Sequence, residues 1–211
     1  MKRRTKIKVC GIREVEHGLA AIDAGAEYLG FVFYPPSHRN LALEEAERLV
    51  GELKQARPFH WKAVGVFDNE RPERMNLIVE RVGLDLAQLC GHESPEECAR
   101  VDVPIVKVVR IDEQGLPAAP TDPAAWNAER VLLDSARPGD WGGTGESYPW
   151  SAVRPIARQA ILAVGLRPDN VAEAVALAEP WGVDVSSGVE RDRRKDISLI
   201  RRFIDEVHGV E

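Results

Sequence analysis

Short segments rich in β-branched residues alternate with longer segments of helical periodicity along the whole chain. The predicted strands lie at residues 7–12, 27–33, 60–67, 84–90, 105–110, 131–134, 160–164 and 183–185. The predicted helices follow them at 15–24, 43–54, 73–81, from 94, 123–128, 151–157, 170–178 and 197–207. Strands that alternate with helices form parallel sheets with right-handed crossovers. Eight such units predict an α/β fold, the closed (β/α)8 TIM barrel.

The length of 211 residues lies close to the lower limit for that barrel. We therefore expect a single domain over residues 1–211, with residues 1–6 as a short basic N-terminal extension. The structural alternative is an open doubly wound sheet, which normally has fewer strands at this length and a G-x-G-x-x-G turn when it binds a dinucleotide. The segment Gly142-Gly143-Thr144-Gly145 does not match that turn.

Charge and composition restrict the partners. With 28 Lys and Arg against 34 Asp and Glu, the net charge is −6, which argues against a nucleic-acid or membrane-surface binder. No apolar run reaches the roughly 20 residues of a membrane span. The three widely spaced cysteines suit a reducing cytoplasm and lack the spacing of a metal site. We expect a cytoplasmic protein without a metal, and a monomer rather than a homodimer.

Polar residues share one face at the ends of several predicted strands. Alternate residues of a strand face opposite sides, and the outer face of a barrel must pack on apolar helices. The pairs assigned to the interior face are Lys8 with Cys10, Gln88 with Cys90, Leu132 with Asp134, and Asp184 with Ser186. Active sites of this fold lie at the carboxyl ends of the strands. This end, the barrel mouth, should therefore carry Cys10, Cys90, Asp134, Asp184 and Ser186.

A thiol and carboxyls at one mouth suit proton transfer. A thiol acts as a base when nearby cations lower its pKa, and Lys8 is the candidate cation for Cys10. A carboxyl whose pKa is raised by its surroundings can donate a proton. An acid and a base that face each other across a pocket suit an isomerisation that needs no cofactor.

The last two loops suggest an anion site. Val164-Gly165-Leu166 follows the seventh predicted strand, and 184–189 (Asp-Val-Ser-Ser-Gly-Val) closes the eighth. Phosphate sites in these barrels are commonly built by those two loops. Either segment alone reads as an ordinary turn, whereas both together favour a phosphorylated small molecule as ligand.

Several segments, in order, resemble the phosphoribosylanthranilate isomerase family. They are Lys8-Val-Cys-Gly-Ile12, Gly30-Phe-Val-Phe-Tyr-Pro-Pro36, Val64-Gly-Val-Phe67, Gln88-Leu89, Leu132-Leu-Asp134, Gly142-Gly-Thr-Gly145 and Val183-Asp-Val-Ser-Ser-Gly-Val-Glu190. The resemblance implies an isomerase of tryptophan biosynthesis. Its reaction is the Amadori rearrangement of N-(5-phosphoribosyl)anthranilate to 1-(2-carboxyphenylamino)-1-deoxyribulose 5-phosphate.

The resemblance also implies roles for individual residues. Cys10 matches the general base that acts on the sugar C2 proton, and Asp134 matches the general acid that opens the furanose ring. Arg39 matches an arginine near the anthranilate carboxylate, and Asp184 matches a carboxylate near the substrate amine. The positions that match the family's phosphate loops are Gly165, Ser186, Ser187 and Gly188.

The chain departs from the family pattern at four places. Cys90 replaces a histidine, whose role would be lost or pass to His92. Val164 replaces a glycine, and its side chain is expected to narrow the pocket or to block one approach to the backbone. His38 replaces a proline before Arg39, and the usual Pro-Gly before Lys195 is missing.

Two other hypotheses about function remain open. A non-catalytic phosphosugar-binding relative with the same barrel would be consistent with Val164 and Cys90, although both proton-transfer positions are intact. Another phosphate-binding barrel, such as a sugar-phosphate epimerase or the related histidine-pathway isomerase, is the third. The latter usually has a carboxylate where this chain has Cys10.

Overall fold

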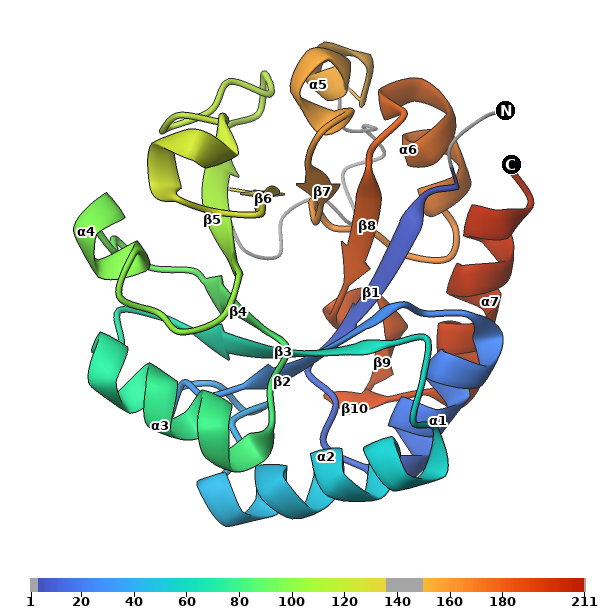
Figure 1. Ribbon diagram of the computed structural model, residues 1–211. Coiled ribbons are helices and arrows are strands. Elements are labelled where there is room, and N and C mark those ends of the chain that lie inside the picture. Colours follow the sequence, from blue (N-terminus) through green and yellow to red (C-terminus); the bar gives the residue numbers. More distant parts are fainter. Residues whose placement is uncertain (1–3, 136–149, 211) are drawn as a thin grey trace.

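The computed structural model describes residues 4–135 and 150–210. Eight parallel strands close into a barrel in chain order, β1 to β8, and helices surround them (Figure 1). The strands are β1 (Lys6–Cys10), β2 (Tyr28–Val32), β3 (Lys62–Phe67), β4 (Leu86–Leu89), β5 (Ile105–Ile111), β6 (Arg130–Ser135), β7 (Ile161–Leu162) and β8 (Gly182–Val185). The predicted (β/α)8 barrel is therefore confirmed.

Each long helix packs an apolar stripe on the barrel. The α-helices are α1 (Val15–Ala24), α2 (Leu43–Ala56), α3 (Pro72–Val82), α4 (Pro95–Cys98), α5 (Trp150–Ala157), α6 (Val171–Ala178) and α7 (Ile197–His208). In α7 the buried Ile200, Phe203, Ile204 and Val207 recur at helical spacing. Asp196 caps that helix by accepting hydrogen bonds from the Ser198 and Leu199 amides at 2.8 and 3.0 Å. None of the described helices is long and apolar enough to cross a membrane.

The two faces of the strands bury different sets of residues. A large apolar layer lies between the barrel and the helices. A smaller set fills the barrel interior, namely Val64, Leu86, Val106, Val108, Leu132 and Ile161, and above it Cys10, Val32 and Val66 with Cys90. Cys10, Cys90 and Leu132 thus occupy the face that strand alternation predicts.

The structure departs from the sequence prediction along two stretches. Helix α4 has four residues, and the predicted helix near 123–128 is a single 3₁₀ turn, η1 (Pro123–Trp126). Between Ser186 and α7, a 3₁₀ turn η2 (Ser187–Val189) leads into an unpredicted antiparallel pair, β9 (Glu190–Arg191) and β10 (Arg194–Lys195). Asp192 and Arg193 turn this pair with φ of 50° and 63°, which is the geometry of a tight hairpin.

The start of β1 and the ends of the described chain are also defined by the structure. Lys6 pairs with Gly182 in the barrel, so it belongs to β1 and not to a basic extension. Both ends of the described chain lie beside α7 (Figure 1), where Arg4 hydrogen-bonds His208 at 2.7 Å. The segment Gly142-Gly143-Thr144-Gly145, which contributed to the family resemblance, lies outside the described residues.

A buried ion pair supports the loops after β3 and β4. Lys107 on β5 and Glu93 are both almost fully buried, with Nζ 2.7 Å from Oε2. Lys107 also donates to the carbonyl of Gly91 at 2.7 Å. Glu93 Oε1 accepts from the amides of Asn69 and Gly91 at 2.9 and 3.1 Å. These bonds hold the segment that carries Cys90.

Replacing Lys107 with Met should therefore destabilise the protein. The substitution leaves Glu93 buried without its counter-ion, which typically costs about 3–5 kcal/mol of unfolding free energy. Urea denaturation followed by circular dichroism measures the loss. Lys54→Met is the matched control, because Lys54 pairs with Asp85 at the surface, where such pairs contribute less than about 1 kcal/mol. Equal losses in the two variants would contradict the bracing role of Lys107.

Candidate active site

The predicted site residues converge at the carboxyl ends of β1, β6 and β8. Cys10 ends β1, and the hydroxyl of Ser186, just after β8, donates to its carbonyl at 3.2 Å. Gly30 on β2 makes room for the thiol, because a Cβ there would lie 2.7 Å from Cys10 Sγ. Strand β1 pairs with β8 so that Lys8 stands opposite Asp184. Closure of the barrel therefore brings together residues 176 positions apart in the chain.

Burial determines the direction of the pKa shift of the Cys10 thiol. It raises the pKa of Cys10 above its ordinary value, while Lys8 and Lys195 lower it and Asp184 raises it further. The sequence predicts that Lys8 lowers the pKa of this thiol. Lys8 acts in that direction, but its charge is shared with Asp184, and the loss of hydration outweighs it.

Lys8 and Asp184 form a buried ion pair with Nζ 2.9 Å from Oδ2. Burial by itself disfavours the charged amine, yet the pairing with Asp184 raises the pKa of Lys8 above its ordinary value. The second oxygen, Asp184 Oδ1, is buried and accepts no hydrogen bond from the described residues. It is therefore an acceptor that a ligand N–H or O–H can use.

Asp134 is suited to hold a proton. Burial raises the pKa of its carboxyl, Arg110 and the Ser135 amide lower it, and the charge of Asp184 raises it, with a net upward shift. One oxygen accepts from the Ser135 amide at 2.8 Å, and the other pairs with the Arg110 guanidinium. A carboxyl of this kind is the type used for general acid catalysis.

Arg39, in the loop after β2, is held by Glu190, to which the sequence assigned no role. Its Nε and one terminal nitrogen each lie 2.7 Å from an oxygen of Glu190 in β9. Lys195 in β10 donates to the same carboxylate at 2.6 Å and to the Ser186 carbonyl at 2.9 Å. Burial opposes ionisation of Glu190, but Arg39 and Lys195 bring its pKa down to about 2. The proline that His38 replaces is not needed to order this loop, since Ser37 Oγ accepts from the Arg39 amide at 3.1 Å.

The loops after β7 and β8 touch each other. A Cβ on Gly188 would lie 2.0 Å from the Leu166 carbonyl oxygen, so only glycine allows this approach. Gly165 is exposed with φ 57°, and its carbonyl accepts from the Asn170 amide group at 3.1 Å. Val164, in contrast, is fully buried in the layer between barrel and helices. The expectation that its side chain narrows the pocket is therefore wrong, because the segment that follows β7 turns the side chain into the outer apolar layer.

Cys90 is a poor proton carrier. Burial raises its pKa to about 12, and its sulfur accepts from Gln88 Nε2 at 3.5 Å. Beside it a cavity of about 560 Å³ extends toward β5 and η1. His92, Arg110 and Trp126 are among the residues that line this cavity.

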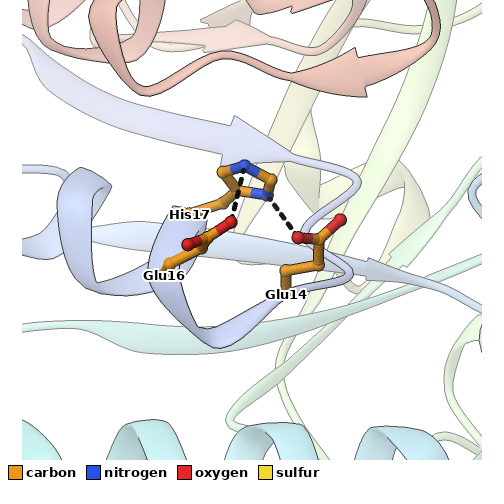
Figure 2. Close-up of side chains that lie close together, drawn as sticks. All are labelled: Glu14, Glu16 and His17. Atoms are coloured by element: carbon orange, nitrogen blue, oxygen red, sulfur yellow. Dashed lines mark ion pairs between the residues drawn. The ribbon is translucent and has the colours of Figure 1, made fainter.

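One cluster among the described residues has the composition of a metal site. Figure 2 shows that Glu14 and Glu16 flank the ring of His17, at 3.9 Å from Nδ1 and 3.8 Å from Nε2. Arg194 of β10 already supplies a cation, with its Nε 2.8 Å from Glu14 and a terminal nitrogen 3.7 Å from Glu16. The cluster therefore ties the loop after β1 to the β9–β10 pair.

Three charged residues at the barrel mouth were not predicted as site residues from the sequence: Arg110, Glu190 and Lys195. Strand alternation places Arg110 on the same interior face as Val106 and Val108, and the same alternation places Asp134 on the interior face of β6. The sequence therefore contained a signal for Arg110. Glu190 and Lys195 stand in an unpredicted hairpin, and no periodicity marks them.

A closed (β/α)8 barrel with a buried thiol and two carboxyls at the carboxyl ends of its strands has the architecture of a barrel enzyme that transfers protons. Comparison with known proteins identifies the family. The model of the N-(5'-phosphoribosyl)anthranilate isomerase family matches residues 7–206. The chain belongs to this family.

Individual relatives agree with the assignment. The N-(5'-phosphoribosyl)anthranilate isomerase of Trichlorobacter lovleyi is 41% identical over 94% of this chain and 96% of its own. The crystal structure of phosphoribosyl anthranilate isomerase from Thermus thermophilus superimposes with a TM-score of 0.82 at 34% identity, covering 98% of this chain and 100% of that one. A complex of such an isomerase with reduced 1-(o-carboxyphenylamino)-1-deoxyribulose 5-phosphate gives 0.79 at 34% identity, covering 97% and 99%.

The position of the Arg39 side chain is expected to depend on the absence of a Cβ at Gly11. Gly11 has φ 81°, and a Cβ there would lie 2.5 Å from Arg39 Cδ. Gly11→Ala should lower the unfolding free energy by at least about 1 kcal/mol, the cost of left-handed backbone for an L-residue. It should also displace Arg39 from Glu190 in a crystal structure of the variant.

The control for this prediction is Gly51→Ala in α2, where an added Cβ meets nothing within 4 Å. In a helix interior that change should raise stability by about 0.5–1 kcal/mol. A Gly11→Ala protein as stable as wild type, with Arg39 in place, would contradict the role assigned to Gly11.

Proposed function

We propose that the protein catalyses the Amadori rearrangement of N-(5-phosphoribosyl)anthranilate to 1-(2-carboxyphenylamino)-1-deoxyribulose 5-phosphate, a step of tryptophan biosynthesis. The observation that carries the proposal is the placement of Cys10 and Asp134 at one barrel mouth. Membership of the isomerase family supports it. So does the relative whose structure holds the reduced product.

The first step opens the sugar ring. Asp134 donates its proton to the furanose ring oxygen, the bond from C1 to that oxygen breaks, and the anthranilate nitrogen lone pair forms a C=N bond. This yields a cationic iminium. The raised pKa of Asp134 supports the role, because the carboxyl must carry a proton when the ring opens.

The second step removes the proton from C2. The Cys10 thiolate takes it, the electron pair forms a C1=C2 bond, and the iminium nitrogen regains its lone pair. The resulting enolamine tautomerises: C1 gains a proton and the C2 hydroxyl loses one, which leaves the ketone. Transfer of the proton on Cys10 to the Asp134 carboxylate through solvent then restores both groups. Lys8 and Lys195 stabilise the thiolate. The iminium places a further positive charge next to C2, and this charge offsets part of the effect of burial on the thiol.

The other predicted site residues bind the substrate. In this proposal the unused oxygen of Asp184 accepts from the substrate amine, and Arg39, held by Glu190, faces the anthranilate carboxylate. Gly165, Ser186, Ser187 and Gly188 bind the phosphate. The contact between Leu166 and Gly188 supports this last assignment, because it brings the two loops into a single surface.

The alternative readings lose support in the structure. Val164 was one argument for a non-catalytic relative, and its side chain lies in the outer apolar layer. The hypothesis of a histidine-pathway isomerase expects a carboxylate where Cys10 stands.

We also propose that the enzyme is cytoplasmic, since Cys10, Cys90 and Cys98 are all free thiols. The monomeric state stays a prediction.

Removal of either proton-transfer group tests the mechanism. Cys10→Ala and Asp134→Asn should each lower kcat by at least about 100-fold with an unchanged circular dichroism spectrum, since general acid or base catalysis contributes at least that much. Cys98→Ala and Asp102→Asn are matched controls, one at a thiol in the outer apolar layer and one at an exposed carboxylate. Both controls should keep wild-type turnover.

Growth gives an independent measurement of the same prediction. The wild-type gene should rescue a tryptophan auxotroph that lacks this isomerase, and the Cys10 and Asp134 variants should not. A well-expressed wild-type chain that fails to rescue would favour the non-catalytic reading. Rescue by either variant would refute the mechanism.

Substitution of Gly188 tests whether the loops after β7 and β8 bind the phosphate. Because Gly188→Ala must push the loop after β8 away from Leu166, KM should rise by about tenfold or more with a smaller change in kcat. Gly209→Ala is the control, since an added Cβ there makes only an ordinary contact of 3.4 Å. An unchanged KM in Gly188→Ala would remove the support for a phosphate site between these loops.

A further inference from the structure

Arg110 and Asp134 are locked opposite each other by the longest ladder of the barrel. Strands β5 and β6 pair over six positions, from Val106 with Arg130 to Ile111 with Ser135, and Arg110 stands directly across from Asp134. The loop after β5 returns to the same place, because the Ala118 amide donates to the Arg110 carbonyl at 2.8 Å. The backbone therefore fixes both residues at the barrel mouth.

Because of this register, the side chains of Arg110 and Asp134 contact each other. A terminal nitrogen of Arg110 pairs with Asp134 Oδ2 and lies 3.3 Å from the Ser135 carbonyl. Asp134 Oδ1 accepts from the Ser135 amide. Both carboxyl oxygens are thus held, and the plane of the carboxyl is set. Arg110 is also one of the residues that line the 560 Å³ cavity, and its side chain is 41% exposed.

Few other charged groups face Asp134. Asp184 on β8 is a like charge, and Cys90, directly after β4, is a thiol whose pKa burial raises to about 12. Lys8 is already paired with Asp184. Arg110 is accordingly the cation that acts on Asp134 among the described residues.

We propose that Arg110 is a positioning residue for the acid step: it orients the Asp134 carboxyl toward the substrate ring and determines the pH range over which that carboxyl carries its proton. This inference rests on the proposed function of Asp134. The guanidinium favours the charged carboxylate and the burial of Asp134 favours the neutral acid. Arg110 thereby sets how readily the acid releases its proton when the ring opens.

The sign of the pH effect follows from these opposing influences. The acid step needs protonated Asp134, so turnover falls as the pH rises through the pKa of that carboxyl. Removing the guanidinium leaves only the Ser135 amide to oppose the effect of burial, so the pKa of Asp134 rises. The basic limb of the kcat profile should therefore move to higher pH in Arg110→Gln. Loss of orientation should also lower the maximal kcat, by about tenfold to 100-fold.

The experiment compares the pH dependence of kcat in wild type, Arg110→Gln and Arg110→Lys. The lysine variant restores the positive charge, so its basic limb should return to the wild-type position. Arg74→Gln is the matched control, because it removes an exposed arginine that pairs with Glu70 on the outer surface. Its profile should coincide with that of wild type.

A second measurement does not need turnover. The ¹³Cγ resonance of Asp134, assigned by its loss in Asp134→Asn, should titrate at higher pH in Arg110→Gln than in wild type. If the two titrations and the two basic limbs coincide in folded protein, the inference is overturned. If wild type lacks isomerase activity while the titration still moves, the proposed function fails and the coupling of Arg110 to Asp134 stands.

Discussion

Closure of the barrel between β1 and β8 is the constraint on which the site depends. An open sheet would leave the first and last strands at opposite edges, with Lys8 and Asp184 far apart. Parallel pairing of β1 with both β2 and β8 brings them face to face. It also sets Ser186 on the carbonyl of Cys10. The same closure turns every second residue inward, so the chemistry-bearing side chains gather at one end.

The barrel mouth of this acidic protein is organised by cations that are each bound to a carboxylate. Lys8 pairs with Asp184, Arg110 with Asp134, and Arg39 and Lys195 share Glu190. Each charge offsets the loss of hydration of its partner. The pairs also determine which groups can change protonation state. Glu190 stays ionised with a pKa of about 2, whereas burial raises the pKa of both Asp134 and Cys10.

The two main departures from the family pattern have different consequences. The side chain of Val164 packs in the outer apolar layer, away from the barrel interior. Cys90 faces inward beside Cys10, but its burial keeps the thiol neutral. The contact between the loops after β7 and β8 depends on Gly188, and the family's glycine at position 164 is not required for it.

Local pattern in the sequence determined the fold class, the order of the strands and the inward position of Cys10, Asp134 and Asp184. Period-two alternation within a strand is enough to assign a face, and most helix bounds follow from apolar spacing and caps. Apart from Lys8 beside Cys10, the sequence did not reveal the partners of these residues. The Arg110–Asp134 contact needs the register between β5 and β6, and Glu190 reaches Arg39 only through a hairpin whose turn has no glycine. The direction of the Cys10 pKa shift likewise depends on the balance of burial against two lysines, and only the tertiary structure decides that balance.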